Sequence, residues 1–152
     1  MPYPSTAAGG GNPSSRRLRI LVVDDDHDGR VALGILLRQA GMEVALAESV
    51  PEARRSLERM APDAVLSDLV MPEEDGFALR GALRAKESEI GRHIPTLVIS
   101  ALSDPEIERR AADEGFDAYF VKPCDFQEVV GSLARLTTVG TTGRPVRSSR
   151  VG

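Results

Sequence analysis

The chain has 152 residues, of which 41% are hydrophobic, and a formal net charge of -4. This length suits one domain with a buried core, and no apolar run reaches the ~20 residues that a membrane-spanning helix needs. The single cysteine, Cys124, excludes an internal disulfide framework. Because the first residues also lack the apolar core of a signal peptide, we expect a cytoplasmic protein with no membrane contact.

Charge divides the chain into an acidic centre and two basic ends. Residues 18–136 hold 14 of the 19 Lys and Arg residues and all 23 Asp and Glu residues, a balance of -9. An acidic domain repels nucleic acid, so we expect no direct nucleic-acid binding. The other five arginines lie in Ser-, Thr- and Gly-rich segments, 1–17 and 137–152, which are predicted to be disordered tails around a domain at 18–136.

In chain order, residues 18–23 form a short apolar run typical of a strand buried on both faces. Segment 28–40 follows as a predicted helix, with Gly41 where its C-terminal cap is expected. Its apolar residues at helical spacing are Val31, Ile35 and Leu36. A second strand is expected at 42–47.

The next helix is predicted to run from Ser49 to about Met60, because Ser49 and Glu52 have capping-box spacing and Pro51 is tolerated in a first turn. The remaining predicted elements are strand 64–67, helix 75–86, strand 96–99, a helix from Ser103 to just before Gly115, strand 118–121 and helix 125–136. Five strand-helix units with apolar strands predict an α/β fold, with a parallel sheet covered by helices on both faces.

Ligands of such sheets bind at the carboxyl ends of the strands. The polar residues that follow the predicted strands are Asp24, Asp25 and Asp26 after the first, Asp68 after the third, Ser100 after the fourth and Lys122 after the fifth. One edge of the sheet is therefore predicted to gather carboxylates, a hydroxyl and an ammonium group.

Crowded carboxylates repel one another unless a cation joins them, and Mg²⁺ prefers oxygen ligands. We expect Asp25 and Asp68 to bind Mg²⁺ directly and Asp24 to act through water. Zinc is disfavoured, because His27 and His93 are far apart in the sequence and the cysteine is alone.

With a metal bound, the carboxylate of Asp68 is a candidate nucleophile towards phosphorus, as in proteins that form aspartyl phosphates. Phosphoryl transfer depends mainly on positioning and charge neutralisation. Lys122 is suited to pair with the phosphoryl oxygens, and Ser100 is suited to donate a hydrogen bond.

Four stretches of the sequence resemble the response-regulator receiver domain of two-component signal transduction. They are ILVVDDD (20–26), LSDLVMPEEDGF (66–77), VISA (98–101) and AYFVKP (118–123), and the resemblance covers residues 18–136. It implies a flavodoxin-like, CheY-like doubly wound sheet of five parallel strands in the order 2-1-3-4-5 with five helices.

The resemblance also implies a role for each matching residue. These roles are Asp24 and Asp25 as the acidic pair, Asp68 as phosphoacceptor, the Val70 carbonyl as a further Mg²⁺ ligand, Ser100 as the conformational hydroxyl, Tyr119 as an aromatic that moves inward when Ser100 shifts, Lys122 as the phosphate-contacting lysine, and a cis peptide between Lys122 and Pro123. Asp26 and Asp28 are interpreted as helix-start residues.

A receiver domain would take its phosphoryl group from a phosphohistidine on a sensor histidine kinase or a histidine phosphotransfer protein. It would catalyse only its own phosphorylation, and in some cases its own dephosphorylation, so we predict a regulatory domain and no enzyme acting on an outside substrate. Its downstream target, an unknown protein, is expected to bind around residues 104–120. Phosphorylation-dependent dimerisation is left open.

Two other classes of protein fit the residues less well. A metal-dependent phosphohydrolase of the aspartyl-phosphate type usually carries a second acid two residues after its nucleophile, where this chain has Val70. A DNA-binding regulator needs a helix-turn-helix domain, for which the 16 residues after position 136 are too few unless this chain is a fragment of something longer. Cys124 is expected to be a small packed residue, and both histidines are expected to be solvated.

Overall fold

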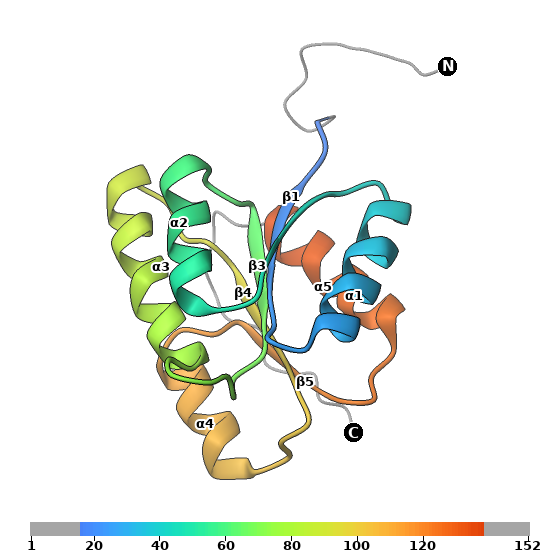
Figure 1. The fold of residues 1–152 in the computed structure, drawn as a ribbon, viewed down its shortest axis with the longest axis vertical. Coiled ribbons are helices and arrows are strands. Elements are labelled where there is room, and N and C mark those ends of the chain that lie inside the picture. The colour runs from blue at the N-terminus through green and yellow to red at the C-terminus, as the bar shows by residue number, and fades with distance from the viewer. Residues whose placement is uncertain (1–15, 139–152) are drawn as a thin grey trace.

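Five short apolar segments form strands, and each is followed by a helix (Figure 1). The elements of this computed structural model are β1 (Arg19–Val23), α1 (His27–Gln39), β2 (Glu43–Ala47), α2 (Val50–Arg59), β3 (Ala64–Ser67), α3 (Gly76–Ile90), β4 (Thr96–Ser100), α4 (Pro105–Asp113), β5 (Ala118–Val121) and α5 (Phe126–Thr138). The predicted alternation of strands and helices is confirmed.

All neighbouring strands are parallel, and their order is β2-β1-β3-β4-β5. β1 lies between β2 and β3, with Ile20 opposite Val44 on one side and Ala64 on the other. The order 2-1-3-4-5 that the family resemblance implies is therefore confirmed. It brings the ends of β1 and β3 side by side, although more than 40 residues separate them in the chain.

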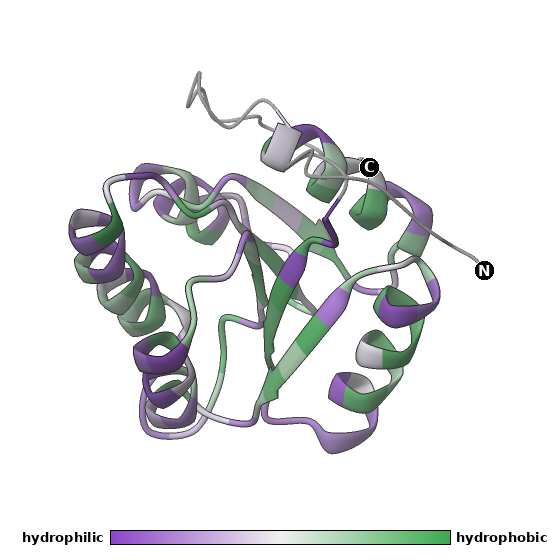
Figure 2. Ribbon diagram, turned by 90° about the horizontal axis from the view of Figure 1, so that it is seen from above, coloured by the Kyte–Doolittle hydropathy of each residue, from purple (hydrophilic) through white to green (hydrophobic). Residues whose placement is uncertain are grey.

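The sheet is the middle of three layers, with α1 and α5 on one face and α2, α3 and α4 on the other (Figure 1). Successive residues of a strand point to opposite faces. Ile20 and Val22 accordingly pack with Leu133 of α5, whereas Leu21 and Val23 pack in the cluster of α2 and α3. Figure 2 shows the apolar strands between helices whose outer faces are hydrophilic. Burial on both faces explains why the strands are continuous apolar runs.

Helix α1 presents a different face to the sheet from the one expected. Ile35 and Leu36 are exposed, while Gly34 and Leu37 are buried. A Cβ atom at Gly34 would lie 3.2 Å from a methyl group of Leu46, so the helix packs close to β2 at this glycine. Because glycine has no apolar side chain, the periodicity of apolar residues did not indicate that Gly34 lies on the buried face of α1.

Several helix ends also differ from the prediction. The N-cap of α4 is Asp104, whose side chain accepts a hydrogen bond from the amide of Glu106; Ser103, the predicted cap, lies one residue outside. α3 continues to Ile90 and ends at Gly91, which has a left-handed conformation (φ 76°). Helix ends depend on caps that several neighbouring polar residues can supply.

His93 is not solvated as expected, because it lies between two carboxylates. Its Nδ1 is 2.8 Å from Glu87 of α3, and its Nε2 is 2.9 Å from Asp117, which precedes β5. Glu87 and Asp117 are 6 and 24 residues away from His93 in the sequence. The contacts form only because the fold brings the end of α3 close to the start of β5, so the sequence did not predict them.

The structure describes residues 16–138. The predicted tails lie outside this part of the chain except for residues 16, 17, 137 and 138. Of these, Arg16 forms an ion pair with Asp63 at 2.9 Å, and α5 includes 137 and 138. Within the described residues, the helices are too short or too polar to cross a bilayer.

Candidate functional site

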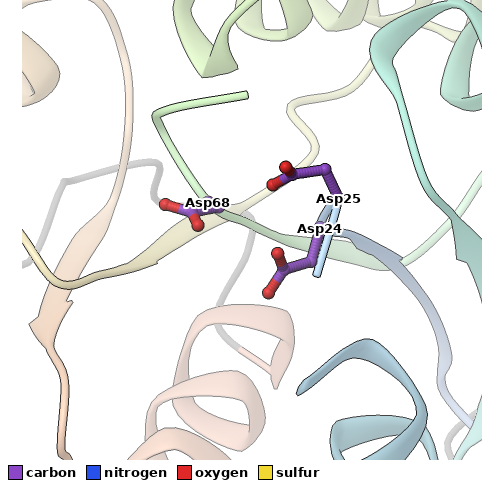
Figure 3. Close-up of side chains that lie close together, drawn as sticks. All are labelled: Asp24, Asp25 and Asp68. Carbon is purple, nitrogen blue, oxygen red and sulfur yellow. The ribbon is translucent and has the colours of Figure 1, made fainter. Parts of the chain in front are cut away.

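The predicted polar residues meet at the carboxyl edge of the sheet. Asp24 and Asp25 follow β1, Asp68 follows β3, Ser100 ends β4 and Lys122 follows β5. Because β1, β3, β4 and β5 are adjacent and parallel, their ends lie along one edge. Figure 3 shows Asp24 and Asp25 leaving one strand end and Asp68 leaving its neighbour.

One carboxylate oxygen from each of Asp24, Asp25 and Asp68 lies within 4.8 Å of the other two. The side chain of Asp24 is only 7% exposed, that of Asp68 is 15% exposed, and Asp25 is open to solvent. Burial raises the pKa of Asp24, and the nearby charges of Asp68 and Asp25 raise it further, against a hydrogen bond from the Asp26 amide and the charge of Lys122. Three oxygen donors at this spacing fit a hard divalent cation such as Mg²⁺.

The backbone around Asp68 holds its carboxylate in place. The Asp68 amide donates to the carbonyl of Val23 at 3.1 Å, and the hydroxyl of Ser67 donates to the Asp68 carbonyl at 2.7 Å. Oδ1 of Asp68 accepts a hydrogen bond from the Leu69 amide at 2.7 Å. A Cβ atom at Gly76 would lie only 2.7 Å from the Asp68 carbonyl oxygen, so the start of α3 packs against this backbone where only glycine fits.

Lys122 faces two of the three carboxylates. Its Nζ atom is 3.7 Å from Oδ2 of Asp24 and 3.9 Å from Oδ2 of Asp68. Its own amide donates to the carbonyl of Ser100 at 2.8 Å, and its peptide bond to Pro123 is cis. One ammonium group cannot balance three carboxylates, so the site keeps an excess of negative charge that attracts a divalent cation.

Ser100 and Tyr119 are connected through the loop between β4 and α4. The buried Ser100 hydroxyl accepts a hydrogen bond from the Leu102 amide at 3.1 Å, and the Tyr119 hydroxyl donates to the Leu102 carbonyl at 3.1 Å. Burial raises the pKa of Tyr119, which keeps its hydroxyl protonated and able to donate. The two residues are thus coupled through one loop residue.

Two neighbouring residues have simpler roles. Asp26 is the N-cap of α1 and accepts a hydrogen bond from the Gly29 amide at 2.8 Å, so its interpretation as a helix-start residue is confirmed. Val70 has an exposed side chain, and its amide lies 3.4 Å from Oδ1 of Asp68. The Val70 carbonyl as a metal ligand stays a prediction.

Arg30 is part of the site, and the sequence reasoning missed it. It lies on α1, and its Nη1 donates to the carbonyl of Asp24 at 2.8 Å. The signal was its spacing, because Arg30, Gly34 and Leu37 are four and three residues apart and therefore share a helix face. A charged residue on a face that packs against the sheet needs a partner, and here the partner is the acidic loop.

Comparison with known proteins gives a consistent result. Residues 20–134 match the family described as response regulator receiver domain. The chain is 39% identical over 110 residues to a gliding motility regulatory protein of Myxococcus xanthus, and 39% identical over 114 residues to an uncharacterized 14.6 kDa protein of Leptolyngbya boryana. These matches cover 72% and 75% of this chain, but 14% of the first relative and 86% of the second.

A solved structure shows the same fold. The chemotaxis response regulator CheY4 of Vibrio cholerae superposes with a TM-score of 0.70 at 26% sequence identity, over 79% of this chain and 98% of that one.

Proposed function

The chain belongs to the response regulator receiver domain family, and on that basis we propose that it is a phosphorylation-controlled switch of a two-component phosphorelay with Asp68 as phosphoacceptor. The observation that carries this proposal is the meeting of three carboxylates within 4.8 Å, with the ammonium of Lys122 3.9 Å from Asp68. Asp24 also follows a strand, accepts a backbone hydrogen bond and lies 3.7 Å from Lys122. The choice of Asp68 as acceptor therefore rests on its place in the stretch 66–77 that resembles the receiver motif.

We place Mg²⁺ among Asp24, Asp25 and Asp68, with the Val70 carbonyl as a further ligand. When bound, Mg²⁺ would neutralise the charge on the transferring phosphoryl group. An oxygen of Asp68 then forms a bond to phosphorus while the bond from phosphorus to the donor's histidine nitrogen breaks, and the electron pair stays on that nitrogen. Lys122 pairs with the phosphoryl oxygens. Its positive charge offsets the repulsion between these oxygens and the carboxylates of Asp24 and Asp25 once the aspartyl phosphate has formed.

The donor is a phosphohistidine on a sensor histidine kinase or on a histidine phosphotransfer protein. Since such kinases use ATP, the proposed place of action is the cytoplasm. The domain catalyses its own phosphorylation, and water attack on the aspartyl phosphate would return it to the starting state. It turns over no outside substrate.

The proposed output is a change in surface. A phosphoryl group on Asp68 adds close to two negative charges. Ser100 then turns its hydroxyl towards that group, and the ring of Tyr119, which is already buried, shifts with it. The changed surface of residues 104–120 then binds a different partner protein.

The test is intact-mass analysis after incubation with acetyl phosphate, with and without Mg²⁺. We expect one phosphoryl group per chain in the presence of Mg²⁺ and none for Asp68→Asn. The matched control is Asp28→Asn, which removes an exposed carboxylate from the first turn of α1 and should be phosphorylated like the unaltered chain. Phosphorylation that survives Asp68→Asn would disprove the assignment of the acceptor.

A further inference from the structure

Arg30 connects α1 to the acidic loop more closely than a surface arginine does. Its side chain is 11% exposed, and its Nη1 donates to the Asp24 carbonyl at 2.8 Å. Its Nη2 lies 3.2 Å from Nδ1 of His27 and 4.0 Å from a carboxylate oxygen of Glu48, which precedes α2. The guanidinium group therefore joins α1 to two different strand-end loops.

The carbonyl that Arg30 holds belongs to the peptide that links Asp24 to Asp25. A peptide unit is planar, so fixing its carbonyl also fixes the direction in which the next residue leaves it. Other bonds hold Asp24 from different sides: its amide donates to the Ala47 carbonyl at 3.1 Å, and its Oδ1 accepts from the Asp26 amide at 3.0 Å. The bond from Arg30 acts at the junction of the two candidate ligands.

Arginine suits this task for two reasons. Its planar guanidinium presents several donors in a fixed geometry, so one side chain can hold a backbone carbonyl and face a second loop. Its charge does not titrate in proteins, so the bond persists over the whole pH range in which the carboxylates ionise.

We propose that Arg30 is a positioning residue for the metal site, and that it sets the orientation of Asp25 relative to Asp24 by holding the Asp24 carbonyl. This inference rests on the function proposed above and deepens it. Arg30 does not touch the metal or the phosphoryl group in this scheme. It acts through the backbone of two residues that do.

The experiment measures Mg²⁺ binding by isothermal titration calorimetry for the unaltered chain, Arg30→Gln and Arg30→Lys. Loss of a group that orients a metal ligand typically weakens metal binding 10- to 100-fold, so we expect Arg30→Gln to raise the Mg²⁺ dissociation constant at least about tenfold. Arg30→Lys keeps one donor and should fall between the two.

The matched control is Arg38→Gln. Arg38 lies on the same helix and also donates from Nη2 to a backbone carbonyl, that of Val44 at 3.2 Å, but away from the acidic loop. Both variants remove one positive charge from α1. The inference is wrong if Arg38→Gln weakens Mg²⁺ binding as much as Arg30→Gln does, because the effect would then come from net charge or general stability.

A second measurement needs no metal. Backbone ¹⁵N relaxation of the metal-free chains reports the order parameters of the Asp25 and Asp26 amides, which we expect to fall from ~0.85 towards ~0.6 in Arg30→Gln and to stay high in Arg38→Gln. Unchanged order parameters in Arg30→Gln would overturn the inference. If the unaltered chain fails to bind Mg²⁺, the proposed metal site is wrong, whereas the relaxation data still decide what Arg30 does.

Discussion

Asp24 carries the largest electrostatic cost among the residues of the site. Folding buries its side chain beside Asp25 and Asp68, and burial raises its pKa. A buried carboxylate among other carboxylates costs folding free energy, which the hydrogen bond from the Asp26 amide, the charge of Lys122 and a bound cation offset. If Asp24 binds a cation as proposed, it does so at the expense of stability, as functional residues often do.

We predict that Asp24→Asn stabilises the metal-free domain. The amide keeps an acceptor for the Asp26 amide but removes the repulsion between the carboxylates. For charges ~4 Å apart, Coulomb's law puts that repulsion between about 1 kcal/mol in bulk water and about 4 kcal/mol near a protein surface. Urea unfolding in EDTA measures this gain, and saturating Mg²⁺ should remove or reverse it because only the charged form binds the cation well. Asp28→Asn is the control. A loss of stability in EDTA would mean that pairing with Lys122 outweighs the repulsion.

The pH dependence of the stability gained in Asp24→Asn follows from the direction in which folding shifts the pKa of Asp24. The folded chain binds a proton at Asp24 more tightly than the unfolded chain, whose carboxyl keeps the usual pKa of 3.8. The stabilising effect of this proton is present below pH 3.8 and is lost as the pH rises through the raised pKa. Asp24→Asn should therefore be more stable than the unaltered chain at pH values above the raised pKa of Asp24, where the unaltered chain carries the charged carboxylate.

At the scale of elements, His93 joins the end of α3 to the starts of β4 and β5. Glu87, on the Nδ1 side of the ring, also accepts from the Ile94 amide, and Asp117, on the Nε2 side, also accepts from the Thr96 amide, both at 2.8 Å. Arg80 of α3, which pairs with Glu87 at 2.8 Å, is the other charged group near the ring. The network lies at the amino end of β4 and β5, away from the acidic edge.

This arrangement predicts a pH-dependent stability. The hydrogen bond to Asp117 raises the pKa of His93, with support from the charges of Asp117 and Glu87 and against burial and Arg80. Because the folded pKa is raised above the usual 6.5, the stabilisation is fully present below pH 6.5 and is lost as the pH rises through the folded pKa. The side chain is 32% exposed, so solvent screening limits the effect to on the order of 1 kcal/mol.

Urea unfolding of the unaltered chain and of His93→Gln, between about pH 6 and pH 9, tests this expectation. The unaltered chain should lose stability with rising pH in that window, and the variant should lose less. The control is His27→Gln, which alters the exposed histidine of α1, the only other histidine of the chain. Equal slopes in all three proteins would show that His93 does not control the pH dependence.

At the scale of the whole molecule, the proposed acceptor Asp68 lies after the central strand β3, while the surface proposed to respond lies at α4 and β5. Ser100 and Tyr119 span this distance, since both hydrogen-bond to Leu102 in the loop before α4. If phosphorylation draws Ser100 and Tyr119 away from Leu102, the Leu102 amide and carbonyl lose their partners together. One event at the sheet edge would then loosen the loop that leads into α4.

Amide hydrogen exchange measured by NMR with acetyl phosphate and Mg²⁺ present tests this coupling. We expect the Leu102 amide to exchange about fivefold faster on phosphorylation, the effect of losing one hydrogen bond of about 1 kcal/mol. The exchange rates of the α2 amides should not change, because α3 separates α2 from α4. In Ser100→Ala the Leu102 amide lacks its partner from the start, so phosphorylation should change its exchange little; an equal acceleration there would contradict the proposed route.

The sequence alone was sufficient for the order of the elements and for which polar residues meet at the site. Apolar runs and caps are local signals, and parallel strands necessarily bring Asp24, Asp25, Asp68, Ser100 and Lys122 to one edge. The strand order came from the family resemblance. The tails at 1–15 and 139–152 stay predictions, as do the roles assigned to the site residues.

Only the tertiary structure decided which side chains meet across the fold. The exposure of Ile35 and Leu36 depends on how closely α1 packs at Gly34, and the partners of His93 come from residues 6 and 24 positions away. The hold of Arg30 on the Asp24 carbonyl requires α1 to be docked on the sheet. Periodicity reports which positions share a face of one element, whereas contacts between elements depend on the distances that packing sets.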